Sequence, residues 1–376
     1  MSYEEDVEYA LKLRSLGYSD PLIEAILIID EARKKDPKES LELLEEALKM
    51  LKGIDKEARL RRARALFFKA RSEYSLGYHK KALKDVEEAI EEMPYENEEL
   101  GRMYLLKARL LEEIMDHNGA IRAAERALML LKDPYAKIEA YFRKALSYMY
   151  LRRGEEALRV LDEAKKEFSN VEDRVLLAEI YRIRGEFLMN LRRPYEALKN
   201  GIKAYKYAHK RASVEDRARN VTLLSLKLIL RAAVELKLVK EAMRAFSLIP
   251  KYLPRDESKA NQEMKDVLDT IGPMLDEMLS VDPKFLLKVL AKVDERIPEG
   301  KPKLYVRLYE GEALLKEGEA RESLEIFKEV LEKAGKDKKL KARAYLGISK
   351  AMIQLGRPDL SAKFFEKAKR TLEKDR

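Results

Sequence analysis

One pattern constrains the fold of this chain more than any other: small or aliphatic residues return at fixed places every 37 to 45 residues. Nine positions, which we call the marker residues, carry this pattern: Ser40, Ala82, Ala120, Ala157, Ala197, Ala242, Leu286, Ser323 and Ser361. Seven residues after each marker stands a second small or aliphatic residue: Ala47, Ala89, Ala127, Ala164, Ala204, Ile249, Val293, Val330 and Ala368. Four residues after each marker stands an apolar residue or glycine: Leu44, Val86, Ala124, Leu161, Gly201, Phe246, Leu290, Phe327 and Phe365. A spacing kept over nine copies indicates an array of similar units, each of which buries apolar surface of its neighbour.

The stretch 63–94 shows what one unit contains. Apolar residues recur at helical spacing in both of its halves. They are Leu66, Ala70 and Tyr74 in the first half, and Ala82, Val86, Ala89 and Ile90 in the second. A short turn at Gly77–Tyr78 separates the halves, and Pro94 ends the unit because proline cannot continue a helix. Each unit is therefore predicted to be a pair of amphipathic helices.

This pattern resembles the tetratricopeptide repeat (TPR), which pairs two helices with small residues at their contact and closes with a proline. The resemblance covers residues 20–376 and is degenerate, because no tryptophan is present and the units exceed the usual length of about 34 residues. It implies an all-α fold, namely a right-handed α-solenoid of about nine helix-turn-helix repeats. Longer helical-repeat families of the same layout remain an open alternative.

The pattern divides the chain into four segments. We expect an N-terminal capping helix in 1–19, TPR-like repeats 1–6 in 20–254, a degenerate repeat or hinge in 255–300, and TPR-like repeats 8–9 with a C-terminal cap in 301–376. Residues 1–19 either cap the first unit or lie in the groove as an internal ligand. In the third segment, Gly272–Pro273 is expected to break a helix.

Composition limits the class of protein. The chain has 376 residues, of which 39% are charged and none is cysteine, so a disulfide framework is excluded. The acidic start lacks the apolar core of a secretory signal, and no run is apolar enough to span a membrane, so we expect a cytoplasmic protein. Two glutamines and a dense Lys/Arg/Glu surface favour a thermophilic source. The net charge of +9 is compatible with anionic partners.

The sequence carries no motif for catalysis. It lacks a phosphate-binding glycine loop, a nucleophile elbow and an H-E-x-x-H pair, and its three histidines fall in different units. We therefore expect no enzymatic activity, no cofactor, no metal site and no small-molecule substrate.

The family resemblance implies that the first helix of each unit lines a concave groove that binds a partner. The groove residues implied in this chain are Arg64, Phe67, Phe68, Arg71, Tyr74, Arg102, Arg109, Phe142, Arg143 and Arg182. Arginines above aromatic side chains suit a protein or peptide with acidic and apolar residues, because the guanidinium group binds carboxylates with two parallel hydrogen bonds. In the alternative interpretation, these arginines pair with acidic residues of adjacent helices.

A second basic surface is expected on one later helix. Lys199, Lys203, Lys206 and Lys210 are spaced four, three and four residues apart, with Arg211 beside them and tyrosines interleaved. Such a stripe could bind phosphates, and it supports an alternative function as an RNA-binding or ribonucleoprotein-binding helical-repeat protein. The plainer interpretation is a solvated helix face. The favoured function is a non-enzymatic scaffold that binds a protein or peptide partner in its arginine-rich groove.

Overall fold

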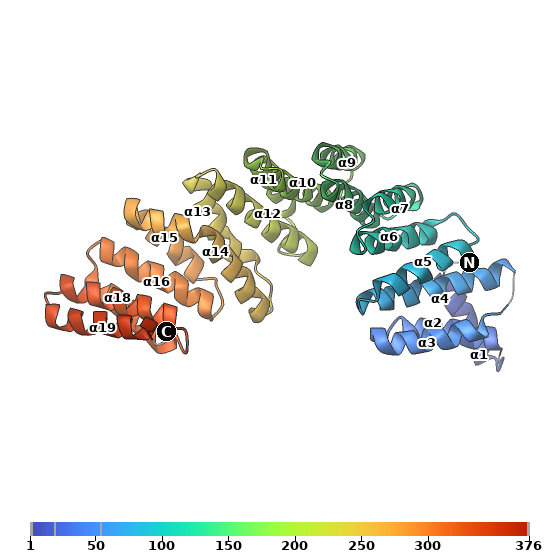
Figure 1. Ribbon diagram of the computed structural model, residues 1–376, viewed down its shortest axis with the longest axis horizontal. Helices are drawn as coiled ribbons and strands as arrows, with labels where there is room; N and C mark the ends of the chain where they lie inside the picture. The colour runs from blue at the N-terminus through green and yellow to red at the C-terminus, as the bar shows by residue number, and fades with distance from the viewer. Residues whose placement is uncertain (1–2, 19, 53–54, 374–376) are drawn as a thin grey trace. The chain divides into compact units, whose positions relative to one another are not determined.

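The computed structural model describes residues 3–18, 20–52 and 55–373, and within these ranges it contains helices and no strand (Figure 1). The chain forms two compact units, Met1–Asn170 and Val171–Arg376. Helices of the first unit are α1 (Tyr3–Ser15), α2 (Pro21–Ala32), α3 (Pro37–Met50), α4 (Lys56–Ser75), α5 (His79–Glu92), α6 (Glu98–Glu113), α7 (His117–Leu130), α8 (Pro134–Tyr150) and α9 (Gly154–Glu167).

The second unit continues the same succession of helices. It contains α10 (Arg174–Asn190), α11 (Pro194–Ala208), α12 (Asp216–Glu235), α13 (Val239–Leu248), the short 3₁₀ helix η1 (Ile249–Tyr252), α14 (Glu257–Val281), α15 (Pro283–Asp294), α16 (Lys301–Lys316), α17 (Ala320–Lys333), α18 (Lys338–Gln354) and α19 (Pro358–Glu373). From α2 onward, each even-numbered helix is the first helix of a pair and the following odd-numbered helix is the second.

The marker residues explain why these helices pair. All nine lie on second helices, and all are buried. The residues seven positions later are also buried, from Ala47 at 0% exposure to Ala368 at 1%. Small residues at these two places let the two helices of a pair approach closely. The prediction of an all-α array of helix pairs is confirmed.

The tight turns inside the pairs share one backbone conformation. In the described ranges, seven turns from a first to a second helix contain a residue with positive φ: Gly77, Met115, Arg152, Arg192, Lys237, Gly318 and Gly356. At the first of these turns, the Tyr78 amide donates to the Glu73 carbonyl at 2.8 Å and the Gly77 amide donates to the Tyr74 carbonyl at 3.0 Å. This pair of hydrogen bonds closes the end of a helix and lets the next helix begin at once.

One local expectation is wrong. Gly272–Pro273 does not break a helix, because α14 continues through Pro273 to Val281. Pro273 lacks the amide hydrogen that would bond to the Asp269 carbonyl, but packing on both sides of α14 holds the helix together. The apolar residues Met264, Val267, Ile271 and Leu275 are buried along it. The segment boundaries expected after residues 19, 254 and 300 stay predictions, and residues 1, 2, 19 and 374–376 lie outside the described ranges.

First helices also pack against one another. In the first unit α4 contacts α6, and α6 contacts α8; in the second unit α10, α12, α14, α16 and α18 contact in succession. In each unit these helices form a common surface, which we call the first-helix face. It is where the predicted groove residues lie in sequence.

Candidate functional site

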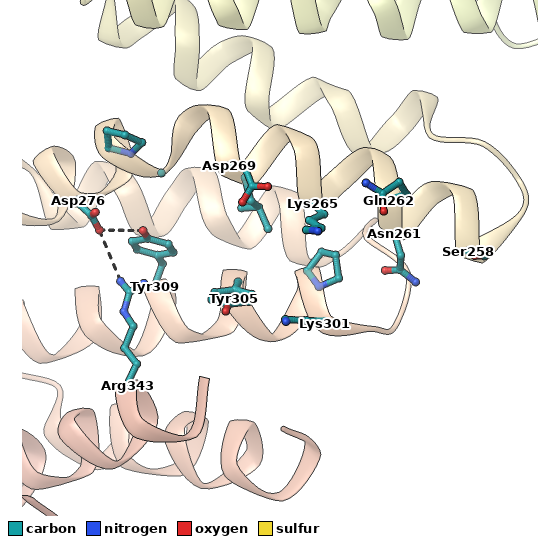
Figure 2. Close-up of a pocket in the computed structure, with 14 residues that line it drawn as sticks. Ser258, Asn261, Gln262, Lys265, Asp269, Asp276, Lys301, Tyr305, Tyr309 and Arg343 are labelled. Atoms are coloured by element: carbon teal, nitrogen blue, oxygen red, sulfur yellow. Dashed lines mark hydrogen bonds and ion pairs between the residues drawn. The ribbon is translucent and has the colours of Figure 1, made fainter. Parts of the chain in front are cut away.

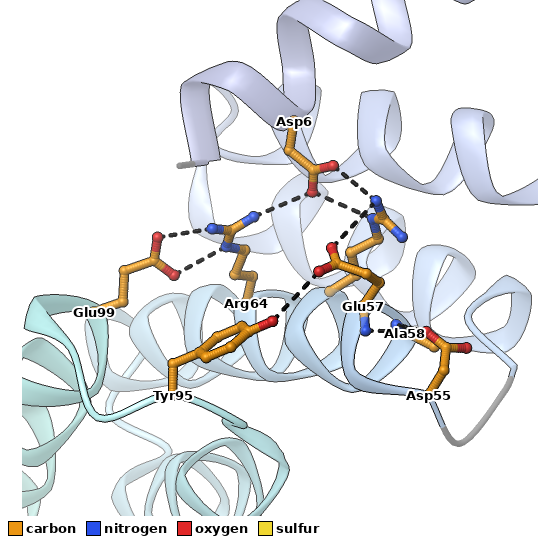
Figure 3. A network of polar contacts seen from close by, with 8 residues as sticks. Asp6, Asp55, Glu57, Ala58, Arg64, Tyr95 and Glu99 are labelled. Atoms are coloured by element: carbon orange, nitrogen blue, oxygen red, sulfur yellow. Dashed lines mark hydrogen bonds and ion pairs between the residues drawn. The ribbon is translucent and has the colours of Figure 1, made fainter. Parts of the chain in front are cut away.

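The predicted groove residues of the first unit begin with Arg64, which is buried in an ion-pair network (Figure 3). Its guanidinium group donates to Asp6 of α1 at 3.1 Å and makes two hydrogen bonds to Glu99 of α6, at 2.9 and 2.8 Å. Arg61 donates to the same Asp6 carboxylate at 2.9 Å. The Asp6 side chain is only 3% exposed, so helix α1 delivers a buried carboxylate to two buried arginines. Arg64 therefore pairs with acidic residues of other helices, as the alternative interpretation of the sequence expects.

Helix α1 also covers part of the aromatic surface. The ring of Tyr3 meets Phe68 edge-on at 5.6 Å, and the guanidinium group of Arg33 lies 4.3 Å from the centre of the Tyr3 ring. Phe67 lies beside Phe68 at 5.7 Å, and both phenylalanines are half-buried. Helix α1 therefore packs on α2, and its residues Tyr3 and Asp6 also contact side chains of α4. Sequence reasoning left the cap and the internal ligand as alternatives, and the choice between them stays a prediction.

Three further arginines of this face are paired. Arg102 bonds to Glu98 within α6 at 3.2 Å, and Arg109 reaches Glu139 of α8. Arg143 of α8 donates to Glu112 of α6 at 2.9 Å. Burial raises the pKa of Glu112, while the charge of Arg143 opposes that effect. The pairs made by Arg109 and Arg143 join the adjacent first helices α6 and α8, whereas the Arg102 pair lies within α6.

Arg71 is different. Arg71 is exposed, and among the residues that the structure describes no carboxylate forms an ion pair with it. Its guanidinium group lies 5.9 Å from the ring centre of Phe67 and 6.0 Å from that of Phe68. Desolvation within the face, followed by the charges of Arg33, Arg109 and Arg102, lowers the pKa of Arg71. Arg71 is thus a cation near two aromatic rings for which no ion pair is found in the described ranges.

Arg182 of α10 is the predicted groove arginine of the second unit. Its Nε atom is buried without a hydrogen-bond partner in the described part of the chain, and burial lowers the pKa of the group. The nearby carboxylates are engaged elsewhere, because Glu179 pairs with Arg217 and Glu186 pairs with Arg231, each at 2.6 Å. Arg71 and Arg182 are thus the two predicted groove arginines for which no ion pair is found among the described residues.

The two other aromatic residues of the predicted set, Tyr74 and Phe142, are half-buried like Phe67 and Phe68. Tyr74 packs against the core between α4 and α5 and meets the ring of His79 at 5.6 Å. Phe142 is half-buried, and the guanidinium group of Arg143 lies 5.4 Å from its ring centre. Tyr74 therefore contributes to packing within its helix pair.

The lysine stripe lies on the surface of α11 and the turn after it. Lys199, Lys203, Lys206 and Lys210 are exposed, and no ion pair to them is found in the described ranges. Lys199 lies 4.4 Å from the ring centre of Tyr195, and Lys203 lies 5.2 Å from that of Tyr181. The neighbouring Arg211 pairs with Asp173 at 3.4 Å and Glu215 at 3.2 Å. The stripe is therefore an exposed basic surface with tyrosines beside it.

Sequence reasoning missed a cavity of about 600 Å³ between α14 and α16 in the second unit (Figure 2). Gly272 and Pro273 line one side, and Tyr305 and Tyr309 come from α16. A Cβ atom at Gly272 would lie 4.0 Å from the Tyr309 hydroxyl, so no side chain fills this place. The sequence signal that could have indicated this cavity is the pair Gly272–Pro273, which lies where the repeat pattern is weakest.

The charges around this cavity are largely paired. Lys301 bonds to Asp337 at 2.5 Å, and Arg343 makes two hydrogen bonds to Glu312, at 2.8 and 2.6 Å. Tyr309 donates to Asp276 at 2.8 Å, and burial raises the pKa of this tyrosine to about 12. The walls of the cavity are mostly apolar and also carry cations and carboxylates, and this mixture does not select one class of ligand.

Two further observations concern metal binding and membrane spans. In the ranges described, no three or more His, Cys, Asp or Glu side chains converge in a way that could hold a metal ion. Within the same ranges, none of the helices combines the length and the apolar character needed to cross a membrane.

No protein-family model matches the sequence, and no curated protein matches it either. Solved structures do. The apo form of the quorum sensor NprR from B. thuringiensis is 14% identical, with 98% of this chain and 98% of NprR covered and a TM-score of 0.50. The STAND protein with a tetratricopeptide repeat sensor from Pyrococcus horikoshii is 14% identical over 97% of this chain and 51% of that chain, with a TM-score of 0.46. A thermophilic TPR protein in Thermus thermophilus is 18% identical over 59% of this chain and 100% of that one, with a TM-score of 0.35.

Proposed function

This chain has the tetratricopeptide-repeat fold, and from that premise we propose that it is a non-enzymatic scaffold that binds a protein or peptide partner. The partner carries acidic and apolar residues and contacts the first-helix face at Arg71. We expect the protein to act in the cytoplasm, without a cofactor.

The observation that carries this proposal is the unpaired state of Arg71. On the same face, Arg64, Arg102, Arg109 and Arg143 each have a carboxylate partner within the chain. Arg71 has none in the described ranges and sits above Phe67 and Phe68. A partner carboxylate would replace the water around Arg71, while an apolar side chain beside it would cover the rings.

A peptide array tests the proposal. We would probe immobilised peptides that combine Asp or Glu with Phe, Tyr or Leu, and a matched set in which Lys replaces the acids. The full chain should select the acidic set, and Arg71→Gln should weaken that binding roughly 10- to 150-fold, the value of one charge-assisted hydrogen bond. The control is Arg102→Gln on the same face, whose arginine is already paired. Equal binding by the Arg71 variant would contradict the proposal.

A second candidate function rests on the lysine stripe. Four exposed lysines without an ion pair in the described ranges, next to Tyr181 and Tyr195, favour binding of single-stranded RNA. Fluorescence anisotropy with a labelled oligonucleotide measures this directly. Lys203→Glu with Lys206→Glu should abolish binding, and affinity should fall steeply as salt rises from about 50 to 200 mM. An unchanged affinity in this double variant would exclude the stripe.

A further inference from the structure

A basic surface continues from the lysine stripe of α11 over the next two second helices of the second unit, α13 and α15. Two residues after their markers these helices carry Lys199, Arg244 and Lys288, so three cations hold the same place in successive pairs. Figure 1 shows the three helices in succession along one side of the unit. The following exposed cations form what we call the extended basic face: Lys199, Lys203, Lys206, Lys210, Lys240, Arg244, Lys251, Lys284, Lys288 and Lys292.

The acids of these helices do not balance the extended basic face. Helices α11, α13 and α15 contain one acid each, and two of the three acids are bound by other arginines. Glu196 pairs with Arg193 at 2.6 Å, and Asp294 pairs with Arg307 of α16 at 3.3 Å. The third acid is Glu241 of α13, which is exposed. Among the residues that the structure describes, no ion pair to any cation of the extended basic face is found.

The next second helix, α17, has a different arrangement of charges. There Lys328 pairs with Glu325 and Lys333 pairs with Glu329, each at 2.8 Å and within the helix. The residue two places after the marker of α17 is itself an acid, Glu325. On α15, by contrast, lysines follow one another at four-residue intervals, where like charges repel and weaken a helix. The stability of the helices therefore does not explain the extended basic face, whereas an anionic partner would.

We propose that the extended basic face binds the phosphate backbone of double-stranded nucleic acid. All of its cations except Arg244 are lysines, which act on phosphates as point charges. A surface that recognises protein carboxylates favours the two parallel hydrogen bonds of arginine. A surface that binds membranes adds apolar side chains to its basic ones, and neither α13 nor α15 leaves a large apolar side chain exposed. Phosphates of a nucleic acid are the anions that remain.

The aromatic residues of α13 and α15 favour a duplex over a single strand. Single strands are bound by stacking of their bases on aromatic side chains. Tyr195 offers an exposed ring on α11, but Phe246 of α13 is fully buried and Phe285 of α15 is half-buried. The cations of α13 and α15 therefore reach phosphates without a platform for bases. A duplex presents its phosphates outward while its bases stay paired, so it suits this part of the face.

Fluorescence anisotropy of the full chain with a labelled blunt-ended duplex, made once as RNA and once as DNA, is the test. Binding of either duplex supports the proposal, and the two arms show which one is preferred. If six of the cations meet phosphates, affinity should fall roughly 10³-fold between about 50 and 200 mM salt. Arg244→Glu with Lys288→Glu should weaken binding more than about tenfold and reduce the slope of log affinity against log salt by about two.

The matched control is Lys328→Glu with Lys333→Glu on α17, whose lysines are already paired. It makes the same change in net charge and should leave the affinity and the salt slope of the parent. Circular dichroism checks that both double variants stay helical. Three results would overturn the proposal: equal affinity of the Arg244 and Lys288 double variant and the parent, binding of an unpaired oligonucleotide but of neither duplex, or binding of phosphatidylserine vesicles but of neither duplex.

The proposal rests on the second candidate function only in sharing the lysine stripe, and the two can fail separately. Lys203→Glu with Lys206→Glu tests the single strand at α11, and Arg244→Glu with Lys288→Glu tests the duplex at α13 and α15. Loss of the single strand in the first variant with full duplex binding in the second sinks the duplex proposal alone. Loss of the duplex in the second variant with full single-strand binding in the first sinks the second candidate function alone.

Lysine footprinting locates the contact independently. The full chain is acetylated with and without the duplex, and mass spectrometry measures the modification of each lysine. The duplex should protect Lys284, Lys288 and Lys292 of α15. Lys350 of the first helix α18 is the control, because it is exposed and has no ion pair in the described ranges, and its acetylation should not change. Acetylation of the α15 lysines that is the same with and without the duplex would contradict the proposal.

Discussion

Glu73 of α4 and Asp85 of α5 direct their carboxylates at one ammonium group, that of Lys69. Its Nζ atom lies 2.6 Å from Asp85 and 3.8 Å from Glu73. Both acids are buried, at 4% and 8% exposure. Burial, and next the charge of Asp85, raise the pKa of Glu73 to about 7. One cation does not fully compensate two buried carboxylates, so Glu73 holds a proton more tightly in the folded protein.

The first prediction is a loss of stability as pH rises through neutrality. The pKa of Glu73 is higher in the folded state than in the unfolded chain, where it is about 4.5. Its contribution is therefore fully present below about pH 4.5 and is lost as pH rises through about 7. Glu73→Gln should remove this dependence. Above neutral pH the variant should be more stable than the parent, by on the order of 2–3 kcal/mol.

Thermal unfolding at a series of pH values measures this effect. The control is Glu88→Gln, since Glu88 is an exposed acid of α5. The control should keep the pH dependence of the parent. If the difference in stability between the Glu73 variant and the parent did not change with pH, Glu73 would not titrate in this range.

The second prediction concerns the attachment of α1. Asp6→Asn leaves the buried guanidinium groups of Arg61 and Arg64 with one carboxylate fewer, and loss of one partner from a buried pair costs about 3–5 kcal/mol. Because Glu99 still pairs with Arg64, we expect the damage to concentrate in α1. Hydrogen exchange of the α1 amides should accelerate strongly, while α12 keeps its protection. Glu8→Gln, on the exposed side of α1, is the control. Unchanged protection of α1 in the Asp6 variant would show that apolar contacts alone hold the helix.

These two clusters show where sequence reasoning succeeds and where it stops. The marker residues identify the helix pairs because burial of a small side chain leaves a regular trace in the sequence. The partners of Arg64 leave no such trace: Asp6 and Glu99 are 58 and 35 residues away, and many other acids were equally available. The same limit applies to Arg71, whose unpaired state depends on where every neighbouring acid lies. The exposure of Phe365 could not be foreseen from its own helix, since eight residues at equivalent positions are buried.

The third prediction tests the turns inside the pairs. Arg152 and Arg192 adopt positive φ, at 59° and 58°, a conformation that costs a residue with a Cβ atom about 1–2 kcal/mol. Arg152→Gly removes this strain, although glycine loses more entropy on folding, about 0.5–1 kcal/mol. The net gain should be roughly 0.5–1 kcal/mol, seen as a higher melting temperature. The reciprocal variant Gly77→Ala, at φ 80°, should lower it. The same sign for both variants would contradict the shared turn conformation.

The last prediction concerns the small residues at the centre of each pair. Ala89 is 0% exposed on α5, at the second of the repeated small positions, with Val86 and Met93 buried in the same cluster. Ala89→Leu adds three carbon atoms to a packed contact between α4 and α5 and should cost about 1–3 kcal/mol. Ala291→Leu supplies the control, because Ala291 lies on the exposed side of α15 and a leucine there meets no packed surface. Chemical denaturation followed by circular dichroism should show the loss only for the Ala89 variant. A loss of equal size at both sites would point to helix propensity in place of packing, and the small-residue column would then not be what sets the distance between paired helices.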